Sequence, residues 1–205
     1  VFGTYFQLPI WIIYQSTFLN FEQIAFYASL SLIVEVLVQI PTGAFADIFG
    51  RRLSLALGNL FTALPMILIA FFPQPWVMIP FSIMWGLGKA LSVGTDRPMI
   101  YETLQQAGQE NRYQKILGNS TLYFQVSAAL SILIGGYLYQ VSPSLPYLAS
   151  GFASLIGLFT AFLYIEPKRT DQFNAKQFIA TNIAGFKEIF KNTYMSLLTV
   201  LFVII

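Results

Sequence analysis

Two charged residues, Glu35 and Lys89, lie inside long runs of apolar residues. A charge at the centre of a membrane helix costs about 2.5–3.5 kcal/mol to insert, so it is retained mostly where it pairs or faces water. The two opposite charges can bind each other and fix the packing of two helices. Alternatively, Glu35 can take up and release a proton, since histidine is absent, and Lys89 can bind an anion. The sequence leaves both interpretations open.

Polar and aromatic side chains surround Lys89 at helical spacing. Residues at i, i+4, i+7 and i+11 share one face of a helix. This first stripe consists of Trp85, Lys89, Ser92 and Asp96. A second stripe near the amino terminus consists of Gln7, Trp11 and Tyr14. Polar stripes on otherwise apolar helices can contact a ligand. Asp96 lies near the end of its apolar run, so a solvated charge is the alternative interpretation there.

The composition excludes several other chemistries. Cysteine and histidine are both absent, which removes disulfides, Cys/His metal sites, thiol nucleophiles and Ser–His hydrolytic pairs. The formal net charge of +2 is too small to indicate nucleic-acid binding. We therefore predict no catalytic residue, no metal and no cofactor. An intramembrane hydrolase is the less favoured alternative.

The composition also indicates the surrounding solvent. Hydrophobic residues make up 56% and charged residues 10% of the 205 residues, against about 47% and about 25% in soluble domains. Apolar runs long enough to cross a hydrocarbon core of about 30 Å recur along the whole chain. They are continuous rather than alternating, which favours helices over barrel strands. The predicted fold class is an all-α membrane protein whose partner is the lipid bilayer.

Charged residues and Pro/Gly clusters divide the chain into six predicted spans. They are Val1–Phe18, Ile24–Ala46, Ser54–Phe72, Trp76–Tyr101, Ile116–Gln140 and Leu145–Ile165. We predict three regions: a bundle of six helices over 1–165, a linker over 166–192 and the start of a seventh helix over 193–205. That helix would reach only about 20 Å, so we expect the whole protein to extend beyond this sequence.

Basic residues are distributed unevenly among the connections. Those after the first, third and fifth spans carry none, whereas the other connections carry most of them. These residues are Arg51, Arg52, Arg112, Lys115, Lys168, Arg169, Lys176, Lys187 and Lys191. The positive-inside rule places their connections and the amino terminus in the cytoplasm. We predict an integral protein of a prokaryotic plasma membrane. An amphipathic pattern over 176–191 predicts a helix that lies on the inner membrane surface or packs on the cytoplasmic loops.

The connection between the second and third spans resembles a known signature. It reads Gly43-Ala44-Phe45-Ala46-Asp47-Ile48-Phe49-Gly50-Arg51-Arg52. This sequence resembles, in position and spacing, the G-x-x-x-D-x-x-G-R-R motif of the major facilitator superfamily of transporters. The resemblance implies a six-helix bundle built from two inverted three-helix repeats. It also implies a second, carboxy-terminal bundle that is absent from this sequence, with the substrate near the bilayer midplane between the bundles.

The residues of this signature have expected roles. Gly43 permits close approach of another helix, and Gly50 can adopt a positive φ. The resemblance implies that Asp47 meets a helix of the second bundle. It also implies that Arg51 pairs with an acidic residue at the cytoplasmic end of the fourth helix, for which Glu102 is the best positional match. We expect these residues, with Arg52, to form a conformational latch.

The resemblance implies secondary active transport of a small solute by alternating access. It also implies that the first and fourth helices line the central cavity, so we expect the two polar stripes to form the substrate surface. Proton coupling through Glu35 is a further expectation, and both symport and antiport stay open. The fifth span has Ser131-Ile132 where the antiporters of the family carry Gly-Pro before a Gly-Gly pair, which disfavours drug/proton antiport. A receptor or scaffold on the same fold that carries no solute is the alternative function.

Overall fold

The structure is a computed structural model that describes residues 5–164, except for the side chains of residues 40, 41, 43, 44, 47, 94, 96 and 97. The chain divides into two compact units, Val1–Lys168 and Arg169–Ile205, and the described residues belong to the first. The linker and the seventh helix, predicted over 166–192 and 193–205, lie outside the described residues.

Every regular element within residues 5–164 is helical. The α-helices are α1 (Trp11–Gln15), α2 (Phe21–Phe49), α3 (Arg51–Phe71), α4 (Met78–Gln106), α5 (Tyr113–Val141) and α6 (Leu145–Ala161). Two short 3-10 turns, η1 (Pro75–Val77) and η2 (Glu110–Arg112), precede α4 and α5. The all-α fold class predicted from the sequence is confirmed, and the inverted three-helix repeat stays a prediction.

Four helical segments of the described chain are long and apolar enough to cross a membrane. They are Phe21–Gln39, Arg51–Phe71, Pro75–Gln106 and Glu110–Val141. α2, α4 and α5 contain 29 residues each, about 43 Å of helix at 1.5 Å per residue. They therefore exceed a hydrocarbon core of about 30 Å and extend past it. α6 is apolar but shorter, with 17 residues.

The amino-terminal segment differs from the predicted first span. Residues 5–10 form turns in which Leu8 and Ile10 each donate an N–H to the carbonyl three residues earlier, and the α-helix is limited to Trp11–Gln15. Pro9 accounts for the interruption, because its ring has no N–H and clashes with the carbonyl four residues before it. The prediction of a continuous helix was therefore wrong for residues 5–10 and for residues 16–18, which also form turns.

The junction between α2 and α3 consists of one residue. Gly50 has φ 104° and ψ 145° and is the residue that separates the two helices. Its N–H donates to Ala46 O at 3.0 Å, which closes the last turn of α2. A β-carbon would be strained at this φ, so glycine permits the immediate reversal from one helix into the next.

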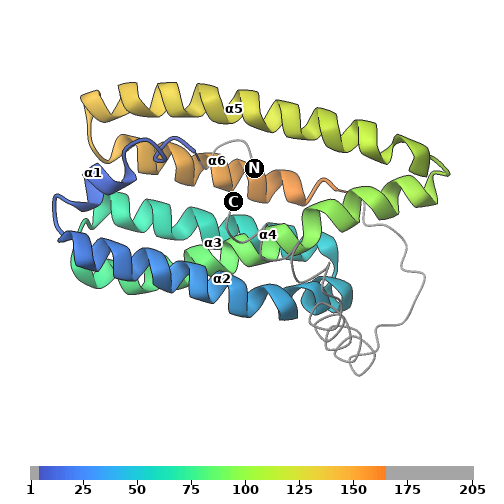
Figure 1. The fold of residues 1–205 in the computed structure, drawn as a ribbon, viewed down its shortest axis with the longest axis horizontal. Helices are drawn as coiled ribbons and strands as arrows, with labels where there is room; N and C mark the ends of the chain where they lie inside the picture. Colours follow the sequence, from blue (N-terminus) through green and yellow to red (C-terminus); the bar gives the residue numbers. More distant parts are fainter. Residues whose placement is uncertain (1–4, 165–205) are drawn as a thin grey trace, which may run out of the picture. The chain divides into compact units, whose positions relative to one another are not determined.

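α3 lies between α4 and α6, and α2 packs on the other side of α4 (Figure 1). Glycines allow these helices to approach closely. A β-carbon on Gly88 of α4 would lie 2.7 Å from Thr62 Cγ2 and 2.9 Å from Gly58 O of α3. One on Gly86 would lie 2.6 Å from Ser31 O of α2. Small residues at such crossings are typical of helix packing in membranes.

Two clusters of buried apolar side chains hold the bundle together. The larger cluster joins α1, α2, α3, α4 and α6 and contains Ile10, Tyr14, Leu19, Ile24, Met66, Ile69, Ala70, Val77, Met78, Phe81 and Tyr147. The smaller consists of Leu55, Ala56, Met99 and Ala161. Between α3 and α4, the buried hydroxyl of Thr95 donates to Ser54 Oγ at 2.9 Å. This bond satisfies polar groups that neither water nor lipid could reach.

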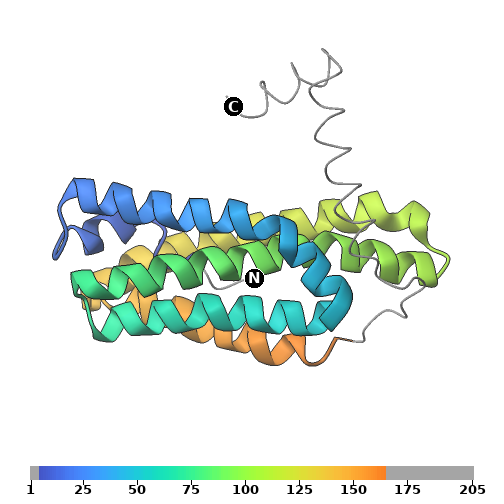
Figure 2. The same cartoon turned by 90° about the horizontal axis from the view of Figure 1, so that it is seen from below.

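The connections of the described bundle alternate between its two ends. The α2–α3 junction and the α4–α5 connection lie at one end, and the α1–α2, α3–α4 and α5–α6 connections lie at the other (Figures 1 and 2). We call the first the basic end, because Arg51, Arg52, Arg112 and Lys115 lie there. Its orientation relative to a membrane follows only from the positive-inside rule.

Large apolar side chains remain exposed along α2, α5 and α6. On α5 they include Leu122, Val126, Leu130, Leu133, Tyr137 and Val141. Such an extended apolar surface is unusual for a protein surrounded by water. It fits a helix whose neighbours are lipid or further helices.

Candidate functional site: a basic-end ion pair and a lysine among aromatic rings

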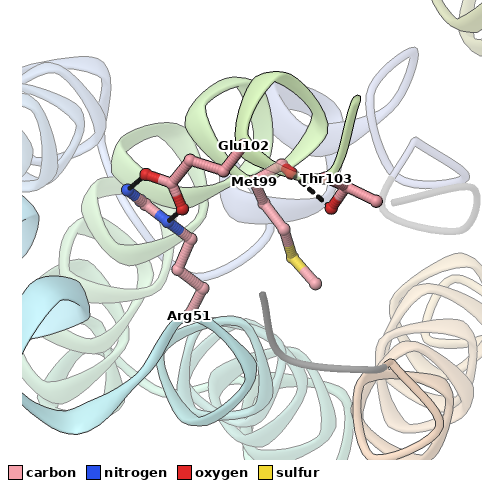
Figure 3. A network of polar contacts seen from close by, with 4 residues as sticks. All are labelled: Arg51, Met99, Glu102 and Thr103. Atoms are coloured by element: carbon pink, nitrogen blue, oxygen red, sulfur yellow. Dashed lines mark hydrogen bonds and ion pairs between the residues drawn. The ribbon is translucent and has the colours of Figure 1, made fainter. Parts of the chain in front are cut away.

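Arg51 and Glu102 form a bidentate ion pair at the basic end. Arg51 Nε donates to Glu102 Oε2 at 2.7 Å, and Arg51 Nη2 donates to Glu102 Oε1 (Figure 3). The Arg51 side chain is 12% exposed and that of Glu102 38%. Parallel N–H···O bonds of this kind fix the relative orientation of both groups. The structure thus joins the first turn of α3 to the last part of α4.

The pair also offsets two unfavourable positions. Arg51 is the first residue of α3, where the helix dipole disfavours a positive charge, and Glu102 lies near the carboxyl end of α4, where the dipole disfavours a negative one. The ion pair offsets both unfavourable interactions with the helix dipoles, because each charge lies next to a charge of opposite sign. Next to Glu102, Thr103 Oγ1 donates to Met99 O at 2.7 Å within the same helix (Figure 3).

Arg52 occupies a different environment from Arg51. Its guanidinium carbon lies 5.4 Å from the centre of the Phe162 ring, directly after α6. A guanidinium over a ring face is attracted by about 0.5–1 kcal/mol where the site is exposed. The two adjacent arginines therefore connect the start of α3 to two different helices. The surroundings of Gly43 and the side chain of Asp47 lie outside the described part of the structure, so their expected roles stay predictions.

Lys89 lies among aromatic rings. Its Nζ is 4.9 Å from the centre of the Trp85 ring and 5.6 Å from that of Tyr5. Trp85 stacks on Phe81, which lies one turn earlier in α4, with ring centroids 6.1 Å apart. Tyr5 makes an edge-to-face contact of 5.3 Å with Phe124 of α5. The rings of Phe81, Trp85, Tyr5 and Phe124 thus connect α4 to α5, and Lys89 Nζ lies next to Trp85 and Tyr5. We call these four residues the aromatic row.

Glu35 of α2 lies within electrostatic range of Lys89. Both side chains are half-buried. Within the described residues, no ion pair joins the two, since the Lys89 ammonium lies over the aromatic rings instead. The sequence analysis left a direct structural pair as one interpretation, and the structure brings the two charges near each other without that contact.

The amino-terminal stripe has mainly packing contacts. Gln7 is buried and its Oε1 accepts a hydrogen bond of 2.6 Å from Ser150 of α6. Tyr14 is buried, and its hydroxyl donates to Ile69 O of α3 at 3.0 Å. Trp11 packs against the larger apolar cluster. These three side chains fasten the amino-terminal segment to α3 and α6, so their expected role in ligand binding stays a prediction without a contact that favours it.

The stripe on α4 divides into two parts. Trp85 and Lys89 are in contact, whereas Ser92 donates to Gly88 O at 3.0 Å and lies against Gly58 of α3. Ser92 thus faces the α3–α4 interface. The side chain of Asp96 lies outside the described part of the structure.

Sequence reasoning missed Tyr5 as a neighbour of Lys89, and it missed Phe81 and Phe124 as the rings that pack against Trp85 and Tyr5. Phe81 stands at i−8 from Lys89 and could have been found from helical spacing, since residues four apart share a face. Tyr5 precedes α1 and Phe124 lies on α5, so their approach to α4 depends on how these elements pack together. Such aromatic contacts between elements have no signal in a single sequence.

Apolar helices of membrane-crossing length, close glycine-mediated crossings and exposed apolar faces define a helical integral membrane protein. The chain belongs to the Major Facilitator Superfamily, a family of transporters whose sequence profile matches residues 1–205. It is also similar to the uncharacterised MFS-type transporter YxaM of Bacillus subtilis (strain 168), with 28% identity over 142 residues, or 68% of this chain. The matched region spans 34% of that relative. The family resemblance predicted from the Gly43–Arg52 connection is confirmed.

Proposed function

We propose that this chain is the amino-terminal bundle of a secondary active transporter that carries a small solute by alternating access. A second bundle completes the substrate site, and the basic end faces the cytoplasm of a prokaryotic cell. The observation that carries this proposal is the bidentate Arg51–Glu102 pair directly after Gly50. It links two helices at one end of the bundle by a contact that can form and break.

The Arg51–Glu102 pair is suited to a latch because it is accessible. Glu102 is 38% exposed and Arg51 12%, so water can reach the carboxylate when the contact opens. The pair lies between a fully exposed ion pair, which contributes about 0–1 kcal/mol, and a fully buried one. A contact with a small free energy shifts the equilibrium between two conformations and leaves both of them populated. A fully buried pair would be far costlier to break.

Solute flux tests the proposal. The full-length protein in liposomes should accumulate a solute when a proton or solute gradient is applied, and liposomes without protein should not. Absence of gradient-dependent flux for every solute that the protein binds would favour a receptor or scaffold instead. The measurement is uptake of radiolabelled solute over time, with the gradient collapsed by an ionophore as the control.

Proton coupling is assigned to Glu35 in this proposal. It is the acidic residue of α2 that lies in electrostatic range of Lys89, within a predicted membrane span. Glu35→Gln keeps the shape of the side chain but removes its carboxyl group. We expect this variant to lose uptake driven by a proton gradient and to keep exchange of solute across the membrane. Unchanged proton-driven uptake would remove Glu35 from the coupling mechanism.

A further inference from the structure

The ammonium of Lys89 has hydrogen-bonding capacity that the described bundle leaves unused. It carries three N–H donors, and its contacts are the ring faces of Trp85 and Tyr5. Ring faces attract a cation but are weak acceptors. Among residues 5–164, no hydrogen bond or ion pair occupies these donors. Two side-chain polar atoms of this region, Tyr147 Oη and Ser154 Oγ, are fully buried without a hydrogen-bond partner. Lys89 Nζ also has no hydrogen-bond partner in this region, but it is not fully buried, since it is not one of these two atoms. Lys89 can therefore donate to a ligand.

The charge at this position selects for an anion. An anionic oxygen accepts charge-assisted hydrogen bonds from an ammonium, and these are roughly twice as strong as neutral ones. A cation would meet the positive charge of Lys89 at close range. Glu35 attracts Lys89 from a distance but does not occupy its donors. The rings thus hold the ammonium in place for an incoming acid group.

The aromatic row selects for an apolar body beside that acid group. Trp85 is half-buried and stacked on Phe81, and the Tyr5 ring makes an edge-to-face contact with Phe124. Each ring next to Lys89 is thus packed against a second ring. Aromatic side chains offer a stacking surface at little cost in conformational entropy, because they have few rotatable bonds. A small hydrophilic anion would leave this surface unused.

From these contacts we propose that the solute is an organic anion with an apolar, preferably ring-containing body. Its acid group binds the Lys89 ammonium, and its body packs on Trp85 and Tyr5. This inference rests on the proposed transport function for its physiological meaning, but the binding site stands on the contacts around Lys89.

Binding to the full-length protein in detergent separates charge from ring chemistry. The probes are benzoate and 2-naphthoate, with acetate lacking the ring, benzyl alcohol lacking the charge and benzylammonium reversing it. We expect the two aromatic carboxylates to bind at least about tenfold more tightly than the other three, since a hydrogen bond to a charged group is involved. Calorimetric titration gives the affinities. Equal affinity for acetate, or tighter binding of benzylammonium, would overturn the proposal.

Matched variants locate the site. Lys89→Gln should weaken aromatic carboxylate binding at least about tenfold, whereas Lys89→Arg should retain most of it. Trp85→Leu should weaken binding about threefold to tenfold. Lys115→Gln alters an exposed lysine on α5 and serves as the control. Binding that survives Lys89→Gln unchanged would contradict the assignment, provided that the variant melts at the wild-type temperature.

Liposome flux then distinguishes this inference from the proposed function. Lys89-dependent binding of benzoate without any gradient-driven flux would support the site and contradict transport. Flux of a neutral or cationic solute, unaffected by benzoate, would support transport and contradict the anion site. Uptake of benzoate or 2-naphthoate that is lost in Lys89→Gln would support both.

Discussion

Gly88 of α4 and Thr62 of α3 are in direct contact, and a β-carbon on Gly88 would come within 2.7 Å of Thr62 Cγ2. The contact places Gly88 on the face of α4 that packs against α3. Because Gly88 faces α3, Lys89 is turned by about 100° around the helix axis, away from that interface. The tight α3–α4 crossing thereby directs Lys89 towards Tyr5 and the aromatic row.

Gly88→Ala should destabilise the bundle. The added methyl group would have to displace Thr62 and the Gly58 carbonyl, and overpacking of this kind costs about 1–3 kcal/mol. Thermal unfolding in detergent, followed by circular dichroism, should show a lower midpoint. Gly118→Ala is the matched control, because a β-carbon on Gly118 of α5 would have no neighbour within 4 Å. There we expect no loss, and a gain of up to about 1 kcal/mol in helix propensity. An equal effect of both substitutions would contradict the close crossing.

Gly50→Ala should impair the α2–α3 junction. Its φ of 104° with ψ 145° lies in a region that is essentially restricted to glycine, and a side chain there costs about 1–3 kcal/mol. Asparagine should not rescue this position. At Gly108, by contrast, the φ of 65° is left-handed helical, which asparagine tolerates. Expression and thermal stability should therefore fall for Gly50→Asn and stay near wild type for Gly108→Asn.

Cysteine labelling tests the orientation of the bundle. These 205 residues contain no cysteine, so only cysteines elsewhere in the full-length protein have to be replaced before single cysteines are introduced here. Ala107→Cys lies at the basic end and Gln74→Cys at the opposite end, and both residues are exposed. In intact cells, a membrane-impermeant maleimide should label the cysteine at position 74 and should not label the one at position 107 until the cells are lysed. The reverse pattern would place the basic end outside.

Much of this architecture could be predicted from the sequence. Apolar run length predicted the helices to within a few residues, except in the first span. In the first span, the run of apolar residues predicted a continuous helix, and the effect of Pro9 was not taken into account. Proline does not always interrupt a helix, because Pro65 lies inside α3 and Pro98 inside α4. The Gly43–Arg52 connection predicted the family because its spacing is specific. Contacts between elements, such as Ser92 with Gly58, depend on helix rotation, and an amphipathic pattern cannot supply that rotation where every face is apolar.

The latch assigned to Arg51 and Glu102 is the central claim and can be tested by charge exchange. The initial rate of solute uptake into liposomes is measured for the full-length wild type, for Arg51→Glu, for Glu102→Arg and for the double variant. Each single change places like charges together, and we expect each to slow uptake. The double variant restores opposite charges, so it should be faster than either single variant, with a coupling of about 1 kcal/mol, or about fivefold in rate. A double variant no faster than the slower single variant would show that the two residues act independently and would contradict the latch.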